Sequence, residues 1–332
     1  MRYSFIIPIY NRPDEMDELL DSLSRQSYAS DFEVVVVEDG SKVDCKQVVA
    51  KYEGQLNIRY FYKANSGPGD SRNYGMQRAT GDYFIILDSD CLLPQGYLAA
   101  VDAQLKREYV SCFGGPDKAL DSFTAIQKAI NFSMTSFFTT GGVRGGSEKL
   151  EKFQPRSFNM GISKEAFERS GGFGNIHPGE DPDLTIRLWN LGYETKLFAD
   201  AYVFHKRRID WNRFYIQVNK FGKARPILNA RYPQYAKATF WFPTLFLVGA
   251  VAGLLFALLG FPHLLGLYGL YFAGLFLVAV WSEKNILIGF LAILATIIQF
   301  YGYGTGFAIS YYRIFVVKLK PEIAFPELFF KN

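Results

Sequence analysis

The feature that most constrains the fold of this chain is the distribution of charge along it. Residues 238–282 contain no Asp, Glu, Lys or Arg, and neither do residues 285–312, whereas the preceding part is normally charged. A transmembrane helix needs about 20 apolar residues, so the two stretches have room for two spans and one span. A very hydrophobic soluble domain is the alternative, but soluble helices seldom run this far without a charge. We therefore predict spans at 240–260, 264–281 and 286–308.

A basic segment precedes the first predicted span. Between His205 and Lys237 the chain carries nine Lys and Arg residues and one acid, Asp210. The positive-inside rule places such a segment, and the domain before it, in the cytoplasm. Aromatic and basic residues also alternate here, which is typical of a helix lying on anionic lipid. Nucleic acid could attract the same mixture, but direct attachment to the spans favours membrane lipids, so we expect no nucleic-acid partner.

The tail after the last predicted span is also basic. It carries Arg313, Lys318, Lys320 and Lys331. Three spans would place this tail outside the cell, which the positive-inside rule disfavours. The last apolar segment can instead be re-entrant or tilted into the interface, and the sequence leaves these alternatives open.

The first 208 residues alternate between strand and helix patterns. Short apolar runs rich in Val, Ile and aromatics predict strands, and helical spacing of apolar residues predicts helices between them. This order indicates an α/β fold with a Rossmann-like, mostly parallel sheet flanked by helices. Strands are expected at 3–9, 33–37, 58–62, 83–87, 110–114, 158–162 and 203–205.

Polar residues follow three of these strands where they end. The run Tyr83–Leu87 leads directly into Asp88 and Asp90, and the earlier strands lead into Asn11 and Asp39. Carboxyl ends of parallel strands meet at one edge of the sheet, where ligands bind. Two acids on a rigid strand end suit a hard divalent cation that also contacts phosphate oxygens. The structural alternative is that these acids only cap a helix or form a turn.

A dinucleotide-dependent dehydrogenase is disfavoured. No G-x-G-x-x-G fingerprint lies between the first strand and the first helix, where it would hold a dinucleotide. The glycines of Gly67-Pro68-Gly69 follow the third strand and read as a loop. Arg72, at the start of the next helix, could instead answer the charge of a pyrophosphate.

Four stretches together resemble the successive signatures of family 2 glycosyltransferases, which have the GT-A fold. They are Pro8–Asn11, Val37–Ser41, Gly67–Gly75 and Leu87–Asp90. The resemblance covers roughly the first 210 residues. It implies an inverting transfer of a sugar from a nucleotide diphosphate sugar, with Mg²⁺ or Mn²⁺ as cofactor.

The resemblance also implies roles for residues at matching positions. Asp39 would contact the base and Arg72 the diphosphate region, while Asp88 would serve the ribose or the metal and Asp90 the metal directly. The remaining residues expected around the nucleotide sugar are Pro8, Tyr10, Asn11 and Ser89. Glu38 departs from the family, which more often has Asp there, and we expect little consequence.

A second acidic motif, Glu180-Asp181-Pro182-Asp183, opens a predicted helix. Acids in a first helical turn are favoured by the helix dipole, which is the structural explanation for all three. The stretch also resembles the family's motif in which the second acid of a Glu-Asp pair is the general base. That acid would be Asp181, taking the proton of the acceptor hydroxyl, with Glu180 binding the acceptor or holding the base. Asp183 is expected to cap the first turn.

His205 ends a short strand and is a candidate metal ligand, because some GT-A enzymes use a histidine here. The alternative is a histidine that only packs against the neighbouring helix. The glycine-rich loop 139–146 is interpreted either as an acceptor-side lid or as a plain connection.

These observations predict a membrane-anchored glycosyltransferase with a UDP-sugar as the expected donor. The acceptor would be a glycan on a lipid carrier or the lipid phosphate itself, and the expected location is a bacterial inner membrane with the catalytic domain in the cytoplasm. A processive polysaccharide synthase and a catalytically dead scaffold are the alternatives. The expected parts are a GT-A domain at 1–208, a juxtamembrane segment at 209–237, membrane spans at 238–312 and a tail at 313–332.

Overall fold

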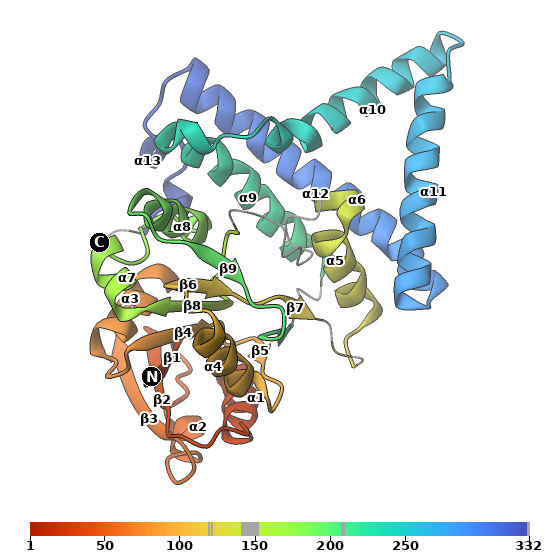
Figure 1. Ribbon diagram of the computed structural model, residues 1–332. Coiled ribbons are helices and arrows are strands. Elements are labelled where there is room, and N and C mark those ends of the chain that lie inside the picture. The colour runs from red at the N-terminus through yellow and green to blue at the C-terminus, as the bar shows by residue number, and fades with distance from the viewer. Residues whose placement is uncertain (119, 121, 141–152, 207–209, 331–332) are drawn as a thin grey trace. The chain divides into compact units, whose positions relative to one another are not determined.

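A computed structural model describes residues 1–118, 120, 122–140, 153–206 and 210–330 of the chain (Figure 1). These residues form two compact units. The sheet unit comprises 1–118, 146–206 and 330–332, and the helical unit comprises 119–145 and 207–329. The chain thus leaves the sheet unit twice and returns to it twice.

The sheet unit contains a seven-stranded sheet with strand order β3-β2-β1-β4-β8-β6-β9. Strands β1, β2, β3 and β4 are parallel, and β8 runs antiparallel to both of its neighbours. The main strands and their bounds are β1 (Tyr3–Ile9), β2 (Glu33–Asp39), β3 (Asn57–Lys63), β4 (Tyr83–Leu87), β6 (Cys112–Gly114), β8 (Asn159–Ser163) and β9 (Thr195–Leu197). The expected mostly parallel α/β sheet is confirmed.

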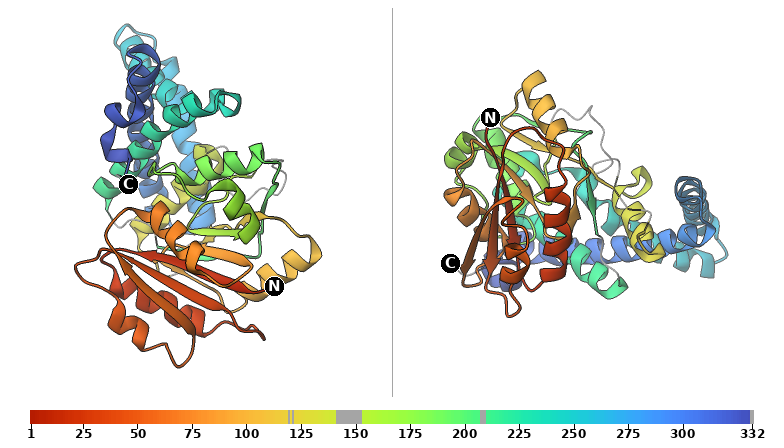
Figure 2. Two further views of the ribbon diagram at one scale, coloured as in Figure 1. Left: turned by 90° about the vertical axis from the view of Figure 1, so that its left-hand side faces the viewer. Right: turned by 90° about the horizontal axis from the view of Figure 1, so that it is seen from below.

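Helices cover both faces of this sheet, as the two views of Figure 2 show. They are α1 (Pro13–Ser24), α2 (Lys46–Ala50), α3 (Pro68–Arg78), α4 (Tyr97–Arg107), α7 (Lys164–Ser170) and α8 (Glu180–Asn190). Alternate residues of the strands supply the two cores, because successive side chains point to opposite faces. Residues of α1, α2 and α4 pack in one core and residues of α3, α7 and α8 in the other.

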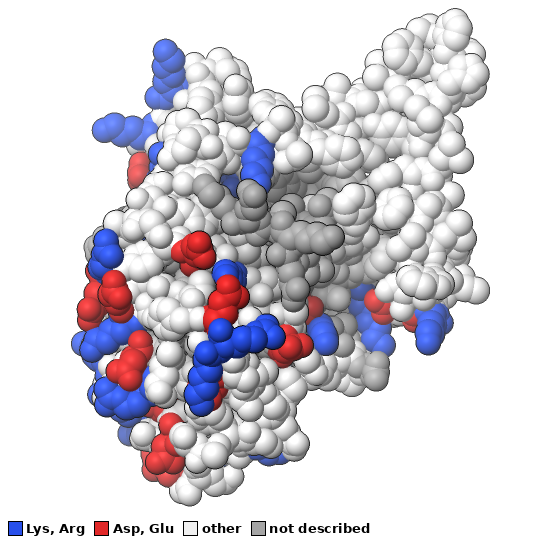
Figure 3. All heavy atoms as spheres, in the orientation of Figure 1, with Lys and Arg blue, Asp and Glu red and all other residues white. Residues whose placement is uncertain are grey.

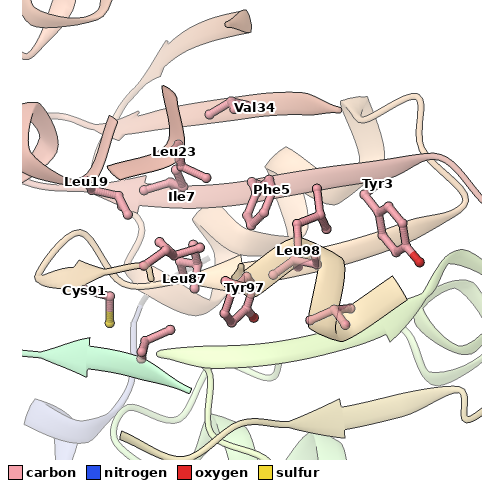
Figure 4. Packing of buried hydrophobic residues seen from close by; sticks show 14 of the residues in the cluster. Tyr3, Phe5, Ile7, Leu19, Leu23, Val34, Leu87, Cys91, Tyr97 and Leu98 are labelled. Atoms are coloured by element: carbon pink, nitrogen blue, oxygen red, sulfur yellow. The ribbon is translucent and has the colours of Figure 1, made fainter. Parts of the chain in front are cut away.

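Figure 4 shows the first of these cores. Tyr3, Phe5 and Ile7 alternate along β1 and face Leu19 of α1 and Tyr97 of α4, and all five are at most 2% exposed. A β-strand buried on both faces must be apolar throughout, which explains the unbroken runs Phe5–Ile7 and Val34–Val37. The helices are thereby fixed against a rigid sheet whose strand ends carry the polar residues.

A second, three-stranded sheet has the order β5-β10-β7 and was not predicted as such. Its strands are β5 (Cys91–Leu92), β10 (Val203–His205) and β7 (Asp117–Lys118). Two-residue strands leave no alternation in the sequence, so β5 and β7 have no signal of their own. This sheet places the end of β10 against the residues that follow β4.

The helical unit consists of the amphipathic helices α5 and α9 and three long apolar helices. Their bounds are α5 (Ala125–Thr135), α6 (Phe137–Thr140), α9 (Trp211–Arg231), α10 (Phe242–Leu258), α11 (His263–Glu283) and α12 (Ile286–Tyr311), with the short helices η1 (Pro233–Tyr235), η2 (Ala238–Trp241), η3 (Tyr312–Val316), α13 (Pro321–Ala324) and η4 (Pro326–Leu328). Helix α5 begins with a capping box formed by Thr124 and Gln127.

The three apolar helices agree with the three predicted spans. Segments 238–258, 263–283 and 286–316 are each long and apolar enough to cross a membrane. On the face drawn in Figure 3, α10 and α11 show almost no charged side chains, whereas Lys, Arg, Asp and Glu are spread over the sheet unit. The C-terminal region therefore fits a membrane anchor.

Candidate active site

The candidate site is built at the carboxyl ends of β1, β2 and β4. Asn11, just beyond β1, adopts a left-handed conformation with φ of 55°, which Asn tolerates better than most residues. Its Oδ1 accepts hydrogen bonds from the backbone N–H groups of Lys42 at 2.7 Å and Val43 at 3.2 Å, and its own N–H donates to Ser41 Oγ at 2.7 Å. Asn11 thus ties the loop after β1 to the loop after β2.

Glu38, in β2, stabilises the loop after β2 to which Asn11 is bound. It is fully buried and accepts hydrogen bonds from Ser41 Oγ, from Cys45 N–H at 2.8 Å and from Tyr60 Oη at 3.3 Å. A buried carboxylate needs such partners to offset its desolvation. The acid at this position therefore holds the loop that holds Asn11.

Asp39, the residue expected to contact the base, is held by the loop after β3. Its Oδ1 accepts from Lys63 Nζ at 2.7 Å and Ser66 N–H at 3.0 Å, and its Oδ2 accepts from Asn65 Nδ2 at 3.2 Å and Gly67 N–H at 3.0 Å. A carboxylate offers about four acceptor positions, so all of them are engaged. Asp39 thus fixes the loop that precedes α3. A ligand N–H group could bind Asp39 only by replacing one of these donors.

Arg72 lies near the start of α3, buried between two acids. Its Nη2 donates to Asp88 Oδ1 at 2.7 Å and its Nη1 to Glu180 Oε1 at 3.2 Å, with the Phe173 ring 5.2 Å from the guanidinium carbon. Burial opposes the charged form, but Asp88 and Glu180 outweigh it and raise the pKa of Arg72. Arg72 therefore joins the end of β4 to the start of α8.

The acid pair of α8 has two different environments. Glu180 also accepts from His177 Nδ1 at 2.7 Å and from Gly179 N–H at 2.9 Å. Burial works against its ionisation, yet His177 and Arg72 prevail and lower the pKa of Glu180 to about 2. Burial and the neighbouring Glu180 charge raise the pKa of Asp181. The two adjacent carboxyls are thus tuned in opposite directions.

The Oδ1 atom of Asp181 is buried and has no hydrogen-bond partner among the residues that the structure describes. Buried polar atoms in proteins generally have a hydrogen-bond partner, so this one calls for an explanation. Asp183, in contrast, accepts from Arg187 Nε at 3.1 Å and Nη2 at 3.0 Å. Asp183 lies in the first turn of α8, whose N-cap residue is Gly179, and its expected role as a first-turn cap stays a prediction.

Asp90 and His205 come together because β5 pairs with β10, where Cys91 lies opposite His205. Asp90 Oδ1 is 3.1 Å from His205 Nε2, and the His205 ring stacks on Phe158 at 4.7 Å. Ligand atoms of Asp90, Cys91 and His205 all lie within 4.8 Å of one another. Carboxylate and imidazole beside each other could hold a metal ion of the Mn²⁺ type.

The other nucleotide-site residues expected from the sequence lie near the ends of β1 and β4. Pro8 pairs with Val37 inside the sheet, and Tyr10 is 49% exposed just beyond β1. Ser89, between the two acids, donates from Oγ to Glu15 Oε2 at 3.2 Å. The loop 141–146, part of the expected acceptor-side lid, lies outside the described residues.

Two residues that contact the candidate site residues were not predicted from the sequence. Arg12 Nη1 lies 2.9 Å from Glu15 and 3.7 Å from Asp90 Oδ2, which puts a cation beside the candidate metal ligand. His177 pairs with Glu180 from three residues upstream. Both were visible as titratable residues flanking predicted motifs, but only the folded chain shows which acid each one reaches.

Comparison with known proteins identifies the family. A family profile described as "Glycosyl transferase family 2" matches residues 4–171, just over half of the chain. The chain belongs to glycosyl transferase family 2 and is a glycosyltransferase. The two acid groups and the sheet edge described above all lie within or next to the matched residues.

Curated relatives match parts of the chain. The poly(ribitol-phosphate) beta-N-acetylglucosaminyltransferase TarS of Staphylococcus aureus is 41% identical over 93 residues, covering 27% of this chain and 16% of TarS. The hyaluronan synthase of Pasteurella multocida is 26% identical over 235 residues, covering 61% of this chain and 24% of that protein. The chain thus spans much less than two thirds of the length of these relatives.

Solved structures confirm the GT-A fold. A mannosyltransferase of Pyrobaculum calidifontis, solved in complex with GDP-Man and Mn²⁺, gives a TM-score of 0.59 at 20% identity, covering 90% of this chain and 86% of that chain. The structure of S. aureus TarS gives a TM-score of 0.52 at 21% identity, covering 69% of this chain and 39% of that chain. At these identities the likeness is one of fold.

Proposed function

We propose that this glycosyltransferase moves a sugar from a nucleotide diphosphate sugar to a hydroxyl or phosphate acceptor with inversion at the anomeric carbon. The observation that carries the proposal is the bridge made by Arg72 between Asp88 and Glu180. It joins the strand ends where the family binds its donor to the acid pair that would act on the acceptor. Asp39, Asn11, Pro8, Tyr10 and Ser89 would frame the nucleotide around this bridge.

Asp181 is proposed as the general base. As the acceptor oxygen bonds to the anomeric carbon, its proton would pass to Asp181 and the bond to the nucleoside diphosphate would break. The orphaned, buried Oδ1 provides an acceptor position without a competing partner among the described residues. A raised carboxyl pKa also strengthens the base relative to an ordinary Asp. Glu180, held ionised by His177 and Arg72, would keep the base in place.

A divalent metal is proposed beside Asp90. Asp90 and His205 would hold it, with Asp88 supporting it from the end of β4. When bound, the metal would neutralise charge on the leaving diphosphate. The imidazole ligand favours Mn²⁺ over Mg²⁺, because Mg²⁺ prefers oxygen ligands. The Mn²⁺ complex of the P. calidifontis mannosyltransferase supports this assignment.

The donor base and the acceptor are proposed more broadly. A UDP-sugar is the first candidate, and the GDP-Man complex of the P. calidifontis enzyme makes a GDP-sugar the second. The basic helix α9 and the apolar helices support a cytoplasmic catalytic domain on a bacterial inner membrane. A lipid-linked glycan or a lipid phosphate is then the acceptor within closest reach of the anchor.

Binding of nucleotides to the full-length protein in detergent tests this function. We expect UDP or GDP to bind in an isothermal titration with Mn²⁺ and much more weakly without it. Asp90→Ala should abolish the dependence on Mn²⁺, whereas Glu165→Gln, at an exposed acid of α7, should leave it unchanged. Failure of every nucleotide to bind with or without metal would favour a catalytically dead scaffold. A screen of nucleotide sugars for hydrolysis then identifies the donor.

A processive synthase is the second candidate, favoured by the match to hyaluronan synthase and to the chondroitin synthase of Escherichia coli, 28% identical over 241 residues. The stretch Gln217–Phe221 on α9 resembles the Gln-x-x-Arg-Trp signature of such synthases in only one of three marker positions. We therefore retain transfer of a single sugar as the proposal.

A further inference from the structure

Helix α12 is the longest apolar helix, yet its contacts do not suit a third crossing. Its 26 residues would extend about 39 Å, at 1.5 Å per residue, which is ample for a bilayer core. A crossing requires that its two ends contact elements on opposite sides of the membrane. The packing partners of each half of α12 within the helical unit show on which side of the membrane that half lies.

The C-terminal half of α12 packs against α9. Gly222 of α9 leaves room only for the Tyr303 backbone, and Gly306 leaves room only for the Asn219 backbone, so the two helices touch through their main chains. Ser310 Oγ also donates to the Lys223 carbonyl at 2.7 Å. Helix α9 follows the sheet unit with no apolar segment between them, so it lies on the catalytic side of the membrane.

The same half of α12 contacts the start of α10. Thr244 Oγ1 donates to the Gly304 carbonyl at 2.9 Å, and the Trp241 and Phe307 rings are 4.8 Å apart. Gly304 is roughly 27 Å along the helix from Ile286 at 1.5 Å per residue. If α12 crossed the bilayer, Gly304 would lie near the membrane surface opposite the catalytic side. The start of α10, which Gly304 contacts, is instead where the chain first enters the membrane from the catalytic side.

The N-terminal half of α12 packs against α5. Ala295 lies in one apolar cluster with Ile130 and Met134, and Ala292 lies in another with Phe132. Helix α5 belongs to segment 119–145, which leaves the sheet unit and returns to it. That segment begins and ends on the catalytic side, so the N-terminal half of α12 is tied to this side as well.

The chain after α12 also stays on the catalytic side. Lys223 Nζ of α9 pairs with Glu327 at 2.9 Å. Phe330 belongs to the sheet unit, where its N–H donates to the Asn175 carbonyl at 3.1 Å and its ring covers Gly67. No apolar stretch of spanning length lies between residues 312 and 330. The end of α12 must therefore face the same side as the catalytic residues.

We propose that α12 lies in the membrane interface on the catalytic side, and that only the hairpin of α10 and α11 crosses the bilayer. The partner of α12 is then the lipid surface itself. Its exposed apolar residues between 290 and 309 are spaced by three, four and eight positions, all close to whole helical turns, so they form one stripe along the helix, as a surface-bound helix requires. The stripe comprises Phe290, Leu294, Ile297, Tyr301 and Ile309.

This arrangement also removes the conflict over the basic tail. With two crossings, Arg313, Lys318 and Lys320 return to the cytoplasmic side, as the positive-inside rule favours. The proposal concerns the anchor and does not depend on the donor, the metal or the base. Its failure would leave the proposed transfer reaction intact.

Labelling of introduced cysteines tests the side of the tail. The full-length variants Lys320→Cys, in the tail, and Arg213→Cys, on α9, would be exposed to a membrane-impermeant maleimide in sealed vesicles of each orientation. We expect both to react in the same orientation, and the parent protein to stay unlabelled because Cys45, Cys91 and Cys112 are buried. Reaction of Lys320→Cys only in the orientation opposite to Arg213→Cys would overturn the proposal.

The depth of α12 gives an independent test. Nitroxide labels on single cysteines at residues 290, 294, 297, 301 and 309 would report their depth by collision with oxygen and a nickel chelate. An interfacial helix gives the same shallow depth at every position. A crossing helix gives labels that deepen toward 297 and become shallow at both ends, over about 28 Å of helix. The second profile would refute the interfacial placement.

Discussion

Arg72 is the residue that connects the two acidic parts of the site. Its side chain is only 3% exposed, and both of its charged partners are carboxylates. A buried cation that loses one partner leaves an uncompensated charge, so the triad constrains Asp88, Arg72 and Glu180 to one geometry. Asp181 owes its own environment to this triad, because the charge of Glu180 next to it helps to raise its pKa.

Asp181→Asn should leave nucleotide affinity unchanged and lower the rate of sugar transfer or donor hydrolysis about 10²–10⁴-fold. The amide is isosteric with the carboxyl but cannot take a proton from the acceptor. Nucleotide release under saturating donor measures the rate, and titration with nucleotide and Mn²⁺ measures affinity. Glu165→Gln, at an exposed acid of α7, is the control. A near-normal rate for Asp181→Asn would remove it as the base.

Arg12 should influence metal and nucleotide in opposite directions. Its guanidinium lies 3.7 Å from Asp90 Oδ2 and competes with a cation for that carboxylate. Because Arg12 is half-exposed and partly screened, we expect Arg12→Gln to tighten Mn²⁺ binding only about three- to tenfold. The same change should weaken binding of a nucleoside diphosphate, which loses a nearby positive charge.

Titration of the protein with Mn²⁺ alone, and then with diphosphate, separates these two effects. Arg25→Gln, at the C-cap of the helix whose N-cap is Arg12 and paired with Asp21, serves as the matched control. Equal weakening of metal and diphosphate binding would show that Arg12 only supports the local structure.

The pair His177–Glu180 should make stability depend on pH. Burial opposes protonation of His177, but Glu180 prevails and raises its pKa above the ordinary 6.5. This contribution is complete below pH 6.5 and is lost as pH rises through the raised pKa. The pKa of Glu180 is lowered from 4.5 to about 2, so its contribution is complete above pH 4.5 and is lost as pH falls toward 2.

The two windows overlap between pH 4.5 and 6.5. The difference in melting temperature between wild type and His177→Gln should be largest there and should shrink above it. Melting of the detergent-solubilised protein across pH measures this difference. In a Glu180→Gln background the same His177 substitution should lose its pH window; persistence of the window would mean that His177 answers another group.

At the scale of elements, glycine spacing decides how α9 and α12 pack. Gly222 and Gly306 lie against the backbone of the opposite helix, where an added Cβ would clash. Gly222→Ala should therefore destabilise the protein by roughly 1–3 kcal/mol, as overpacking does. Gly266→Ala on α11 meets nothing within 4 Å and should be neutral or stabilise its helix by about 0.5–1 kcal/mol.

Thermal melting of both variants in the same detergent gives the comparison. Opposite signs for the two identical substitutions support close main-chain packing of α9 on α12. Equal melting temperatures for the two variants would mean that the helices move apart to accept the added methyl group. The close contact of α9 with α12 would then contribute nothing to the stability of the protein.

The elements themselves were largely predictable, and the exceptions have physical reasons. Runs such as Phe5–Ile7 and Val34–Val37 mark buried strands because nothing else tolerates so continuous an apolar sequence. The strands β5 and β7 are two residues long and exist only because β10 pairs with both. A strand that forms only because a neighbouring strand pairs with it has no periodic pattern in the sequence. The contact of His205 with Asp90 could therefore be suspected only from the family resemblance.

At the scale of the whole molecule, the prediction concerns how many sugars the enzyme adds to a membrane-bound acceptor. Incubation with donor and a lipid-linked acceptor should lengthen the acceptor by one sugar, because α9 lacks most of the marker residues of processive synthases. Mass spectrometry of the extracted product measures the added length. A ladder of products under excess acceptor would instead support the polysaccharide synthase.

The sequence by itself determined the two kinds of environment that this chain requires. Charge-free runs of 45 and 28 residues need lipid, and apolar strands ending in Asn11, Asp39, Asp88 and Asp90 need a sheet with a polar edge. Both conclusions follow from local composition, since the cost of burying a charge does not depend on the rest of the fold.

Only the tertiary structure decided which partner each polar group has. Asp39 and Arg72 are candidate contacts to the nucleotide in the sequence, but in the fold Asp39 is engaged by four donors and Arg72 is buried between two acids. The role of α12 was likewise open, because a crossing helix and an interfacial helix have the same apolar composition. Contacts between residues far apart in the chain distinguish such cases, and no local pattern encodes them.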